Sequence, residues 1–272
     1  ILGAVIVAVC ALAMGAMAVT VPSFFSDNMV LQQDMKVPVW GKGAPGEAVT
    51  VTLGDQTEKV VVGEGGTWKC DLKPVKAAGI LTMTIAGTNT ITITNVVRGE
   101  VWLASGQSNM RFPVERATNS SADIAAANFP QIRMFTAAFA VKGEPQDDVK
   151  GKWEVCTPET VKAFSAVGFF FGREIHKARK VPVGIIHASC DWTPGEAWMP
   201  REALVSDPEL KYMADRWDEI TRVYPDVKKE YDARMVEWNK TAAQAKAEGK
   251  EAPAQPKGPK DPSFIHRASG LW

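Results

Sequence analysis

Residues 37–97 consist of short runs of alternating hydrophobic and polar positions, separated by glycine-rich turns. Such closely spaced runs, with no helical periodicity between them, predict antiparallel strands. The glycines between the runs can adopt the positive φ that tight turns need. We therefore predict a small antiparallel β-sandwich over residues 19–97. Its expected strands are Val49–Leu53, Lys59–Val62, Trp68–Leu72, Leu81–Ile85 and Ile91–Val97.

After residue 97 the alternation gives way to continuous apolar runs. Val101–Ala104 and Val181–Ile186 are such runs, and Ile132–Val141 contains a third. Runs of this kind are typical of strands buried on both faces of a parallel sheet. Residues 167–178 have helical spacing, with Ser165 as the candidate N-cap. The order strand, helix, strand predicts an α/β domain with crossover helices, which we assign to residues 98–272. The fold class is therefore mixed.

Residues 201–262 are much more charged than the rest of the chain. Asp, Glu, Lys and Arg make up 25 of these 62 residues, against 23% of the whole chain. An apolar stripe recurs at steps of three and four, which predicts one or two long helices. We interpret 201–262 as a charged helical insertion packed on the main domain, and a partner-binding helix is the alternative. A proline-rich segment, Ala252–Pro259, ends the helix. The stripe residues are Met213, Trp217, Ile220, Tyr231, Met235 and Trp238.

The first twenty residues carry no charge and are rich in Ala. They lead to Ala16-Met17-Ala18, the pattern of small residues that signal peptidase accepts. We expect a secretory signal over residues 1–18, incomplete because it starts with Ile rather than Met and has no basic start, and a secreted or periplasmic protein. A transmembrane anchor is the alternative, but a polar, turn-rich segment follows soon after. No stable membrane insertion is expected once the signal is removed.

The remaining composition excludes several classes of protein. Lys and Arg number 31 and Asp and Glu also number 31, so no bulk field attracts nucleic acid. Cys10 lies in the expected signal, and three cysteines are too few for a disulfide framework, although one bridge remains open. The three histidines are scattered, so no metal site is predicted. The three remaining cysteines are Cys70, Cys156 and Cys190.

Two polar loops follow predicted parallel strands. Ser105–Met110 follows the Val101 strand, and Ala188–Trp198 follows the Val181 strand. Ligands of open parallel sheets bind outside the carboxyl ends of the strands, so both loops are expected to face one site. Ser108 is a candidate nucleophile there, provided that a base lies within reach. The alternative is a turn whose Ser and Asn serve only as helix caps. Gln107 and Asn109 carry amides that can hold the loop or donate to an acyl oxygen.

Five separated motifs between Pro22 and Pro200 resemble the sialate O-acetylesterase family of SGNH-type hydrolases. The resemblance implies a β-sandwich followed by a flavodoxin-like SGNH α/β domain, and export from the cytoplasm. It also implies removal of O-acetyl groups from sugars without any metal or organic cofactor. The motifs are Phe25–Gln32, Val37–Gly41 with Pro45–Glu47, Gly99–Met110, Phe164–Val167 and Thr193–Trp198.

Carried over by motif, Ser108 matches the family's nucleophile, and its backbone N–H is one oxyanion donor. A second donor is expected from the loop after Ser189, where the family usually has Trp-Gly-Gly-Thr. This chain has Cys190-Asp191-Trp192-Thr193, so Asp191 and Trp192 replace both glycines. Asp tolerates positive φ better than Trp. A carboxylate beside a developing oxyanion repels it unless the carboxylate points away or is protonated.

The resemblance places the family's late Asp and His beyond the position of Trp272, so we expect the α/β domain to be truncated. Three histidines within the chain are candidates for a substitute base. His176 is predicted on the surface and His187 in a core or loop position, and His266, in the terminal segment, is a weak candidate. Because no base is assigned, little or no esterase activity is expected from residues 1–272 alone.

Further residues of the two loops have supporting roles in this interpretation. Glu196 matches a recurrent family position and is expected to hold its loop through a backbone hydrogen bond. Trp102, Trp192 and Trp198 are candidates for a sugar platform, although Trp102, in an apolar strand, is predicted in the core.

The sequence thus predicts an exported serine esterase that acts on an acetylated saccharide through an acetyl-enzyme on Ser108. Acetylated sugars such as O-acetyl sialic acid are the expected substrate class, and an acetylesterase acting on xylan or another polysaccharide is the alternative. Two other classes remain open: a carbohydrate-binding pseudoenzyme, and an interaction protein built on the charged helices. The particular acetylated sugar, the acetyl position and the oligomeric state are not predicted.

Overall fold

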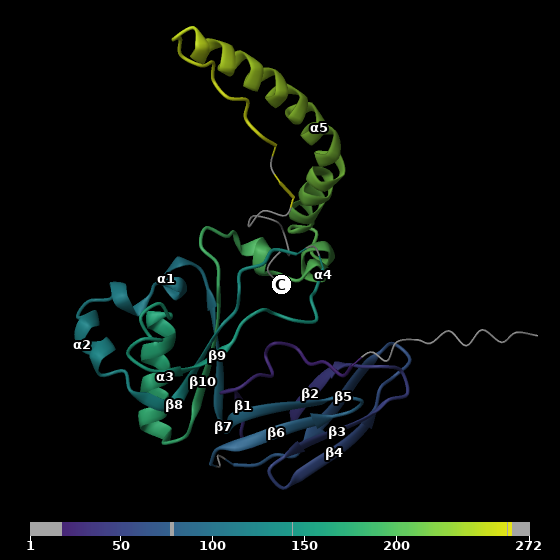
Figure 1. Ribbon diagram of the computed structural model, residues 1–272, viewed down its shortest axis with the longest axis vertical. Coiled ribbons are helices and arrows are strands. Elements are labelled where there is room, and N and C mark those ends of the chain that lie inside the picture. The colour runs from purple at the N-terminus through teal and green to yellow at the C-terminus, as the bar shows by residue number, and fades with distance from the viewer. Residues whose placement is uncertain (1–17, 77–78, 143, 260, 263–272) are drawn as a thin grey trace, which may run out of the picture.

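The computed structural model describes residues 18–76, 79–142, 144–259 and 261–262. Its central feature is a sheet of eight strands in the order β4-β3-β6-β7-β10-β8-β9, with β1 paired to β7, and β2 and β5 form a second sheet. Mixed α/β architecture is therefore confirmed (Figure 1). The strands are β1 (Val30–Gln32), β2 (Val37–Lys42), β3 (Ala48–Leu53), β4 (Gln56–Val61), β5 (Thr67–Leu72), β6 (Leu81–Ala86), β7 (Thr90–Gly106), β8 (Phe129–Thr136), β9 (Trp153–Cys156) and β10 (Val183–Ser189).

Two groups of helices complete the fold. One group lies beside the parallel strands, and the other follows β10 and leads away from them (Figure 1). The helices are α1 (Ser108–Arg111), α2 (Ser120–Ala125), α3 (Ala166–Arg179), α4 (Arg201–Ser206) and α5 (Lys211–Ala247), with 3-10 turns η1 (Val114–Arg116) and η2 (Gly195–Trp198).

The antiparallel strands of the N-terminal part owe their packing to the alternation seen in the sequence. In β3, Val49, Val51 and Leu53 are buried and the residues between them are not. Val39 of β2 and Trp68 of β5 belong to the same hydrophobic cluster. The two sheets therefore cover one another's apolar faces, as period-two patterning requires.

Strand β7 joins the antiparallel part of the molecule to the parallel part. It pairs antiparallel with β6 up to Val96, and parallel with β10 from Glu100 onward. The sequence predicted two separate strands here, Ile91–Val97 and Val101–Ala104, and that division is wrong because the backbone stays extended between them. Gly99 permits the continuity, since a side chain there would overlap the carbonyl oxygen of Pro182.

The parallel strands β7, β10 and β8 are neighbours in that order, and α3 connects β8, through β9, to β10. Ser165 caps α3, because its Oγ accepts a hydrogen bond from the backbone N–H of Gly168 at 3.0 Å. Gly168 and Gly172 let α3 approach the sheet closely, and a Cβ at Gly172 would lie 2.7 Å from Ile185. The predicted helix and its cap are thus present.

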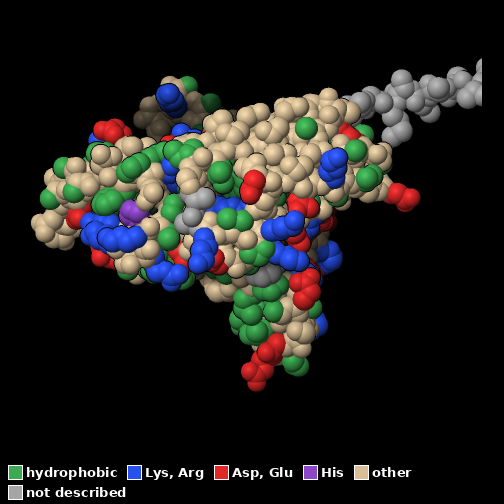
Figure 2. All heavy atoms as spheres, turned by 90° about the horizontal axis from the view of Figure 1, so that it is seen from below, with side chains coloured by type: hydrophobic (Ala, Val, Ile, Leu, Met, Phe, Trp, Pro, Cys, Tyr) green, Lys and Arg blue, Asp and Glu red, His purple; other side chains and the backbone are tan. Residues whose placement is uncertain are grey.

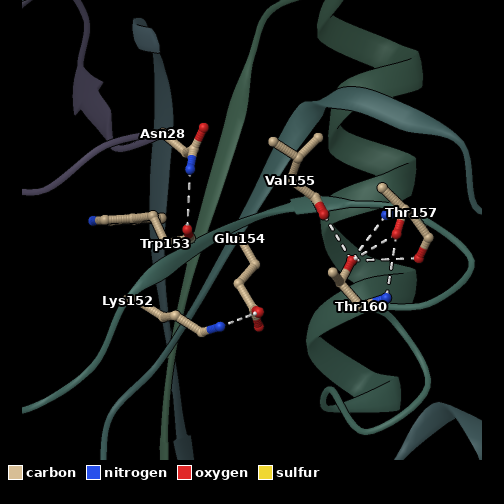
Figure 3. A network of polar contacts seen from close by, with 7 residues as sticks. All are labelled: Asn28, Lys152, Trp153, Glu154, Val155, Thr157 and Thr160. Atoms are coloured by element: carbon tan, nitrogen blue, oxygen red, sulfur yellow. Dashed lines mark hydrogen bonds and ion pairs between the residues drawn. The ribbon is translucent and has the colours of Figure 1, made fainter. Parts of the chain in front are cut away.

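Strand β9 forms the antiparallel edge of this sheet, and polar contacts hold both its ends (Figure 3). The Asn28 amide donates to the Trp153 carbonyl at 3.4 Å. At the other end, the Thr160 hydroxyl donates to the Val155 carbonyl at 2.6 Å and accepts from the Thr157 N–H at 2.9 Å. These turn contacts end the strand and direct the chain toward α3.

Two predictions about burial are wrong. Trp102, predicted in the core, is 41% exposed, and Leu103 is 66% exposed. Within the described ranges, residues 101–106 of β7 pair with β10 alone, so one edge of this segment is uncovered. The Trp102 ring instead packs edge-on against Phe171 of α3, with 5.1 Å between ring centroids.

Helices α4 and α5 account for the charged segment, and α5 extends away from the rest of the molecule (Figure 1). Only the start of α5 is buried, where Ala214 and Trp217 pack against Leu204 of α4. Further along, the proline-rich segment returns beside the helix, and the Trp238 indole N–H donates to the Pro253 carbonyl at 2.8 Å. The narrow apolar stripe is therefore partly covered by the chain that follows it.

The structure also bears on the surface charge and on the predicted absence of a membrane span. Basic and acidic side chains are interspersed over the face seen in Figure 2. Among the described residues, no helix is long and apolar enough to span a membrane. The predicted signal lies outside the described residues except for Ala18, as do Cys10 and His266.

Candidate active site

The two polar loops that follow β7 and β10 lie side by side. The parallel register pairs Ser189 with Gly106 at the ends of the strands. Just beyond, the backbone N–H of Cys190 donates to the Gly106 carbonyl at 3.0 Å. The carboxyl ends of two neighbouring parallel strands therefore form one rim, where open α/β sheets bind ligands.

Thr193 connects three parts of this rim. The Gln107 side-chain amide donates to the Thr193 backbone carbonyl. The Thr193 hydroxyl donates to the Cys190 carbonyl at 2.9 Å and accepts from the Trp198 indole N–H at 2.8 Å. Because Thr193 is only 3% exposed, these bonds are shielded from water and fix the second loop against the first.

Ser108 stands at the start of α1 and is exposed. The chain turns just before it at Gly106, whose φ of 147° is a conformation that favours glycine. Within the described part of the chain the Ser108 hydroxyl has no hydrogen-bond partner, and neither does the exposed Asn109 side chain. The hydroxyl is thus accessible to a ligand from solvent.

Asp191 contacts the helix turn that carries Ser108. Its Oδ2 lies 3.3 Å from Nη1 of Arg111, so the guanidinium offsets part of the carboxylate charge beside the site. Its Oδ1 is buried without a hydrogen-bond partner among the described residues. This arrangement reduces, by charge pairing, the repulsion that a carboxylate would exert on a developing oxyanion.

The left-handed backbone conformation of this loop falls on Trp192, with φ of 59°, and not on Asp191. Asp tolerates this conformation better than Trp, yet the bulkier residue adopts it. The Trp192 side chain is 84% exposed.

His187 does not contact Ser108. Its Nε2 lies 2.7 Å from the Ser189 hydroxyl, and its Nδ1 is buried without a partner in the described structure. Burial, followed by the positive charge of Arg111, lowers the pKa of His187. His187 is 6% exposed, which agrees with the predicted core or loop position. His176, predicted on the surface, is half-buried, and its Nδ1 lies 2.7 Å from the Val181 carbonyl at the end of α3.

The other side chains predicted for the site, Glu196, Trp198 and Trp102, have different surroundings. Glu196 is half-buried, but its carboxylate makes no hydrogen bond within the described ranges, so the predicted backbone contact is absent there. Trp198 braces the loop through Thr193, and Trp102 faces α3. The sequence reasoning missed Arg111 and Thr193, although Thr193 opens the Thr-Pro-Gly-Glu motif that signalled this loop.

The described cysteines are not joined in disulfides. Cys70, Cys156 and Cys190 are free thiols, and burial raises the pKa of Cys156 to about 12. The described residues contain no group of three His, Cys, Asp or Glu side chains placed to hold a metal ion.

Comparison with known proteins identifies the class to which this fold corresponds. A crystal structure of a carbohydrate acetylesterase from Xanthomonas citri matches with a TM-score of 0.67 and 33% identity, covering 69% of this chain and 43% of that one. The fold is thus that of a carbohydrate acetylesterase over the matched part. No family model matches the chain.

The chain is also homologous to sialate O-acetylesterases, which confirms the resemblance found in the sequence. It is 33% identical to the rat enzyme over 224 residues, covering 70% of this chain and 41% of the relative. It is 30% identical to the human enzyme over 220 residues, covering 73% and 42%. The chain therefore spans about two fifths of the length of these relatives, whose names are those of carboxylic ester hydrolases.

Proposed function

We propose that this protein is a serine esterase that removes O-acetyl groups from acetylated sugars such as O-acetyl sialic acid. The observation that carries the proposal is the exposed Ser108 on a rim made by two loops that are hydrogen-bonded to each other. The homology to sialate O-acetylesterases supports the choice of an acetyl ester on a sugar.

In the proposed reaction, the Ser108 oxygen attacks the acetyl carbonyl carbon, and the ester C–O bond breaks. The sugar leaves as the alcohol, taking up a proton, and the acetyl group stays on Ser108 as an ester. Water then attacks this ester, one of its protons goes to the Ser108 oxygen, and the acetyl group is released as acetate together with the second proton. The Ser108 N–H is free of an intrahelical partner, as at the start of any helix, and is the proposed oxyanion donor.

The proton acceptor for Ser108 is proposed to be an Asp and His pair of the kind that serine esterases use. His187 is not proposed for this role, since its Nε2 is already engaged with Ser189. The proposed organisation keeps a signal over 1–18, a β-sandwich over 19–97 and an SGNH-type domain from 98, with export from the cytoplasm.

The proposal is tested by acetate release from O-acetylated sialic acid, with imidazole added as an external base. Purified protein without imidazole is expected to show at most residual hydrolysis, because the Ser108 hydroxyl contacts no base in the described part of the chain. Imidazole is expected to raise the rate in the parent protein. Ser108→Ala should lose this increase, whereas Ser105→Ala, a change at an exposed serine near the end of β7, should keep it.

A rate increase that persists in Ser108→Ala contradicts the nucleophile. If imidazole has no effect on any variant but the sugar still binds, the second candidate, a carbohydrate-binding protein without esterase activity, is favoured. The observation behind this second candidate is Asp191, a carboxylate in the loop expected to donate to the oxyanion.

A further inference from the structure

Trp192 combines two features that are unusual for a tryptophan on a loop. Its backbone has φ of 59°, in the left-handed region that bulky side chains rarely adopt. Its side chain is 84% exposed, so little burial of the indole compensates for that conformation. Unfavourable backbone conformations that the surrounding structure enforces cluster at ligand sites.

The residues on either side of Trp192 attach its loop to the segment that carries Ser108. The residue before it, Asp191, pairs with Arg111 at 3.3 Å, and Arg111 belongs to the same short helix as Ser108. The residue after it, Thr193, accepts the hydrogen bond of Gln107, which directly precedes Ser108. Trp192 is therefore fixed on both sides to the segment that presents the serine.

We propose that Trp192 is a sugar-binding platform that stacks on the pyranose ring whose acetyl ester is presented to Ser108. An exposed indole offers a large flat apolar face, which suits the apolar C–H face of a pyranose ring. This inference rests on the proposed function, and it names the part of the substrate that Trp192 recognises. Sialic acid and xylan both present a pyranose ring, and this ring is the ligand group that Trp192 is proposed to bind.

The other tryptophans near the rim do not have this combination of features. Trp198 is half-buried, and its indole N–H is engaged with Thr193 at 2.8 Å. Trp102 packs edge-on against Phe171 on the α3 side of the sheet. Trp192 is thus the tryptophan of the two loops that combines exposure with attachment to the Ser108 segment.

The test is calorimetric binding to the 272-residue protein of N-acetylneuraminic acid and of xylo-oligosaccharides, each with and without O-acetyl groups, in a Ser108→Ala background that prevents turnover. One or both sugar types should bind, and the difference between them identifies the source of the pyranose. Trp192→Ala should weaken binding about three- to tenfold, and Trp192→Phe should stay within about twofold. Trp40→Ala, the control at an exposed tryptophan of β2, should leave the affinity unchanged.

Trp192→Gly separates the platform from a structural role. Glycine adopts the left-handed conformation without steric cost, so this variant should unfold at a higher temperature than the parent while binding sugar as weakly as Trp192→Ala. Unchanged affinity in Trp192→Ala overturns the inference, and so does a parent protein that binds none of the sugars. Sugar binding that depends on Trp192 without acetate release that depends on Ser108 would refute the esterase and leave the platform intact.

Discussion

The backbone N–H of Cys190 donates to the carbonyl of Gly106 at 3.0 Å, directly where β10 and β7 end. This bond extends the parallel pairing by one step beyond the strands. It places the start of the second loop against the turn that leads to Ser108. The site is therefore positioned by the sheet itself, and the loop side chains only complete it.

Thr193→Val should destabilise the protein by about 1–3 kcal/mol, because it leaves the Trp198 indole N–H and the Cys190 carbonyl without their partner in a buried position. Thr193→Ser keeps the hydroxyl and should lose much less stability. Urea unfolding of the two variants measures the difference, and equal losses would show that the hydroxyl bonds do not hold the loop.

Gly99→Ala should destabilise the protein by about 2–3 kcal/mol, since the added methyl group would overlap the Pro182 carbonyl oxygen between β7 and β10. Gly65→Ala is the control, because a Cβ there meets nothing within 4 Å. Thermal unfolding of both variants tests the prediction. A Gly99→Ala protein as stable as the control would mean that the strands separate at this point without cost.

Stability should fall as the pH decreases below about 6.5, in part because of His187. Burial lowers the pKa of His187 in the folded protein below its ordinary value of 6.5. As the pH falls, the unfolded chain therefore binds the proton before the folded protein does. The loss of unfolding free energy grows until the pH reaches the pKa of His187 in the folded protein. Above pH 6.5 both states are neutral and this contribution disappears. His187→Gln should show a smaller drop in unfolding free energy between about pH 8 and about pH 5, and an unchanged drop would assign it to other groups.

Trp238→Ala should release the proline-rich segment from α5, because it removes the hydrogen bond to the Pro253 carbonyl. Limited proteolysis should then cut residues 249–259 faster, while the main unfolding transition stays unchanged, since only the start of α5 belongs to a buried cluster. Val236→Ala, at an exposed position of the same helix, serves as the control. Equal cleavage rates in the two variants would contradict a role for the indole.

Local patterning predicted the elements that depend on local signals. The alternating strands β3, β5 and β6 and the capped helix α3 occur close to their predicted ranges, because period and capping chemistry act within a few residues. The continuity of β7 was not predictable in this way. It depends on the approach of Pro182 to Gly99, and these residues are far apart in sequence.

The same limit applies to the candidate site. Ser108 and the second loop could be predicted because each directly follows an apolar strand. The exposure of Trp102 and the pairing of Arg111 with Asp191 could not, since both depend on which distant segments lie next to each residue. The left-handed conformation at Trp192 likewise follows from how the loop is tied at both of its ends.

The most direct test of the account is the position of the acetyl group during turnover. The protein is incubated with O-acetylated sialic acid and imidazole, quenched in acid and mapped by peptide mass spectrometry. The account predicts one acetyl group on the peptide that contains Ser108, absent from Ser108→Ala and present in Ser105→Ala. Acetate release with the acetyl group on another residue, or with Ser108 never modified, would contradict it.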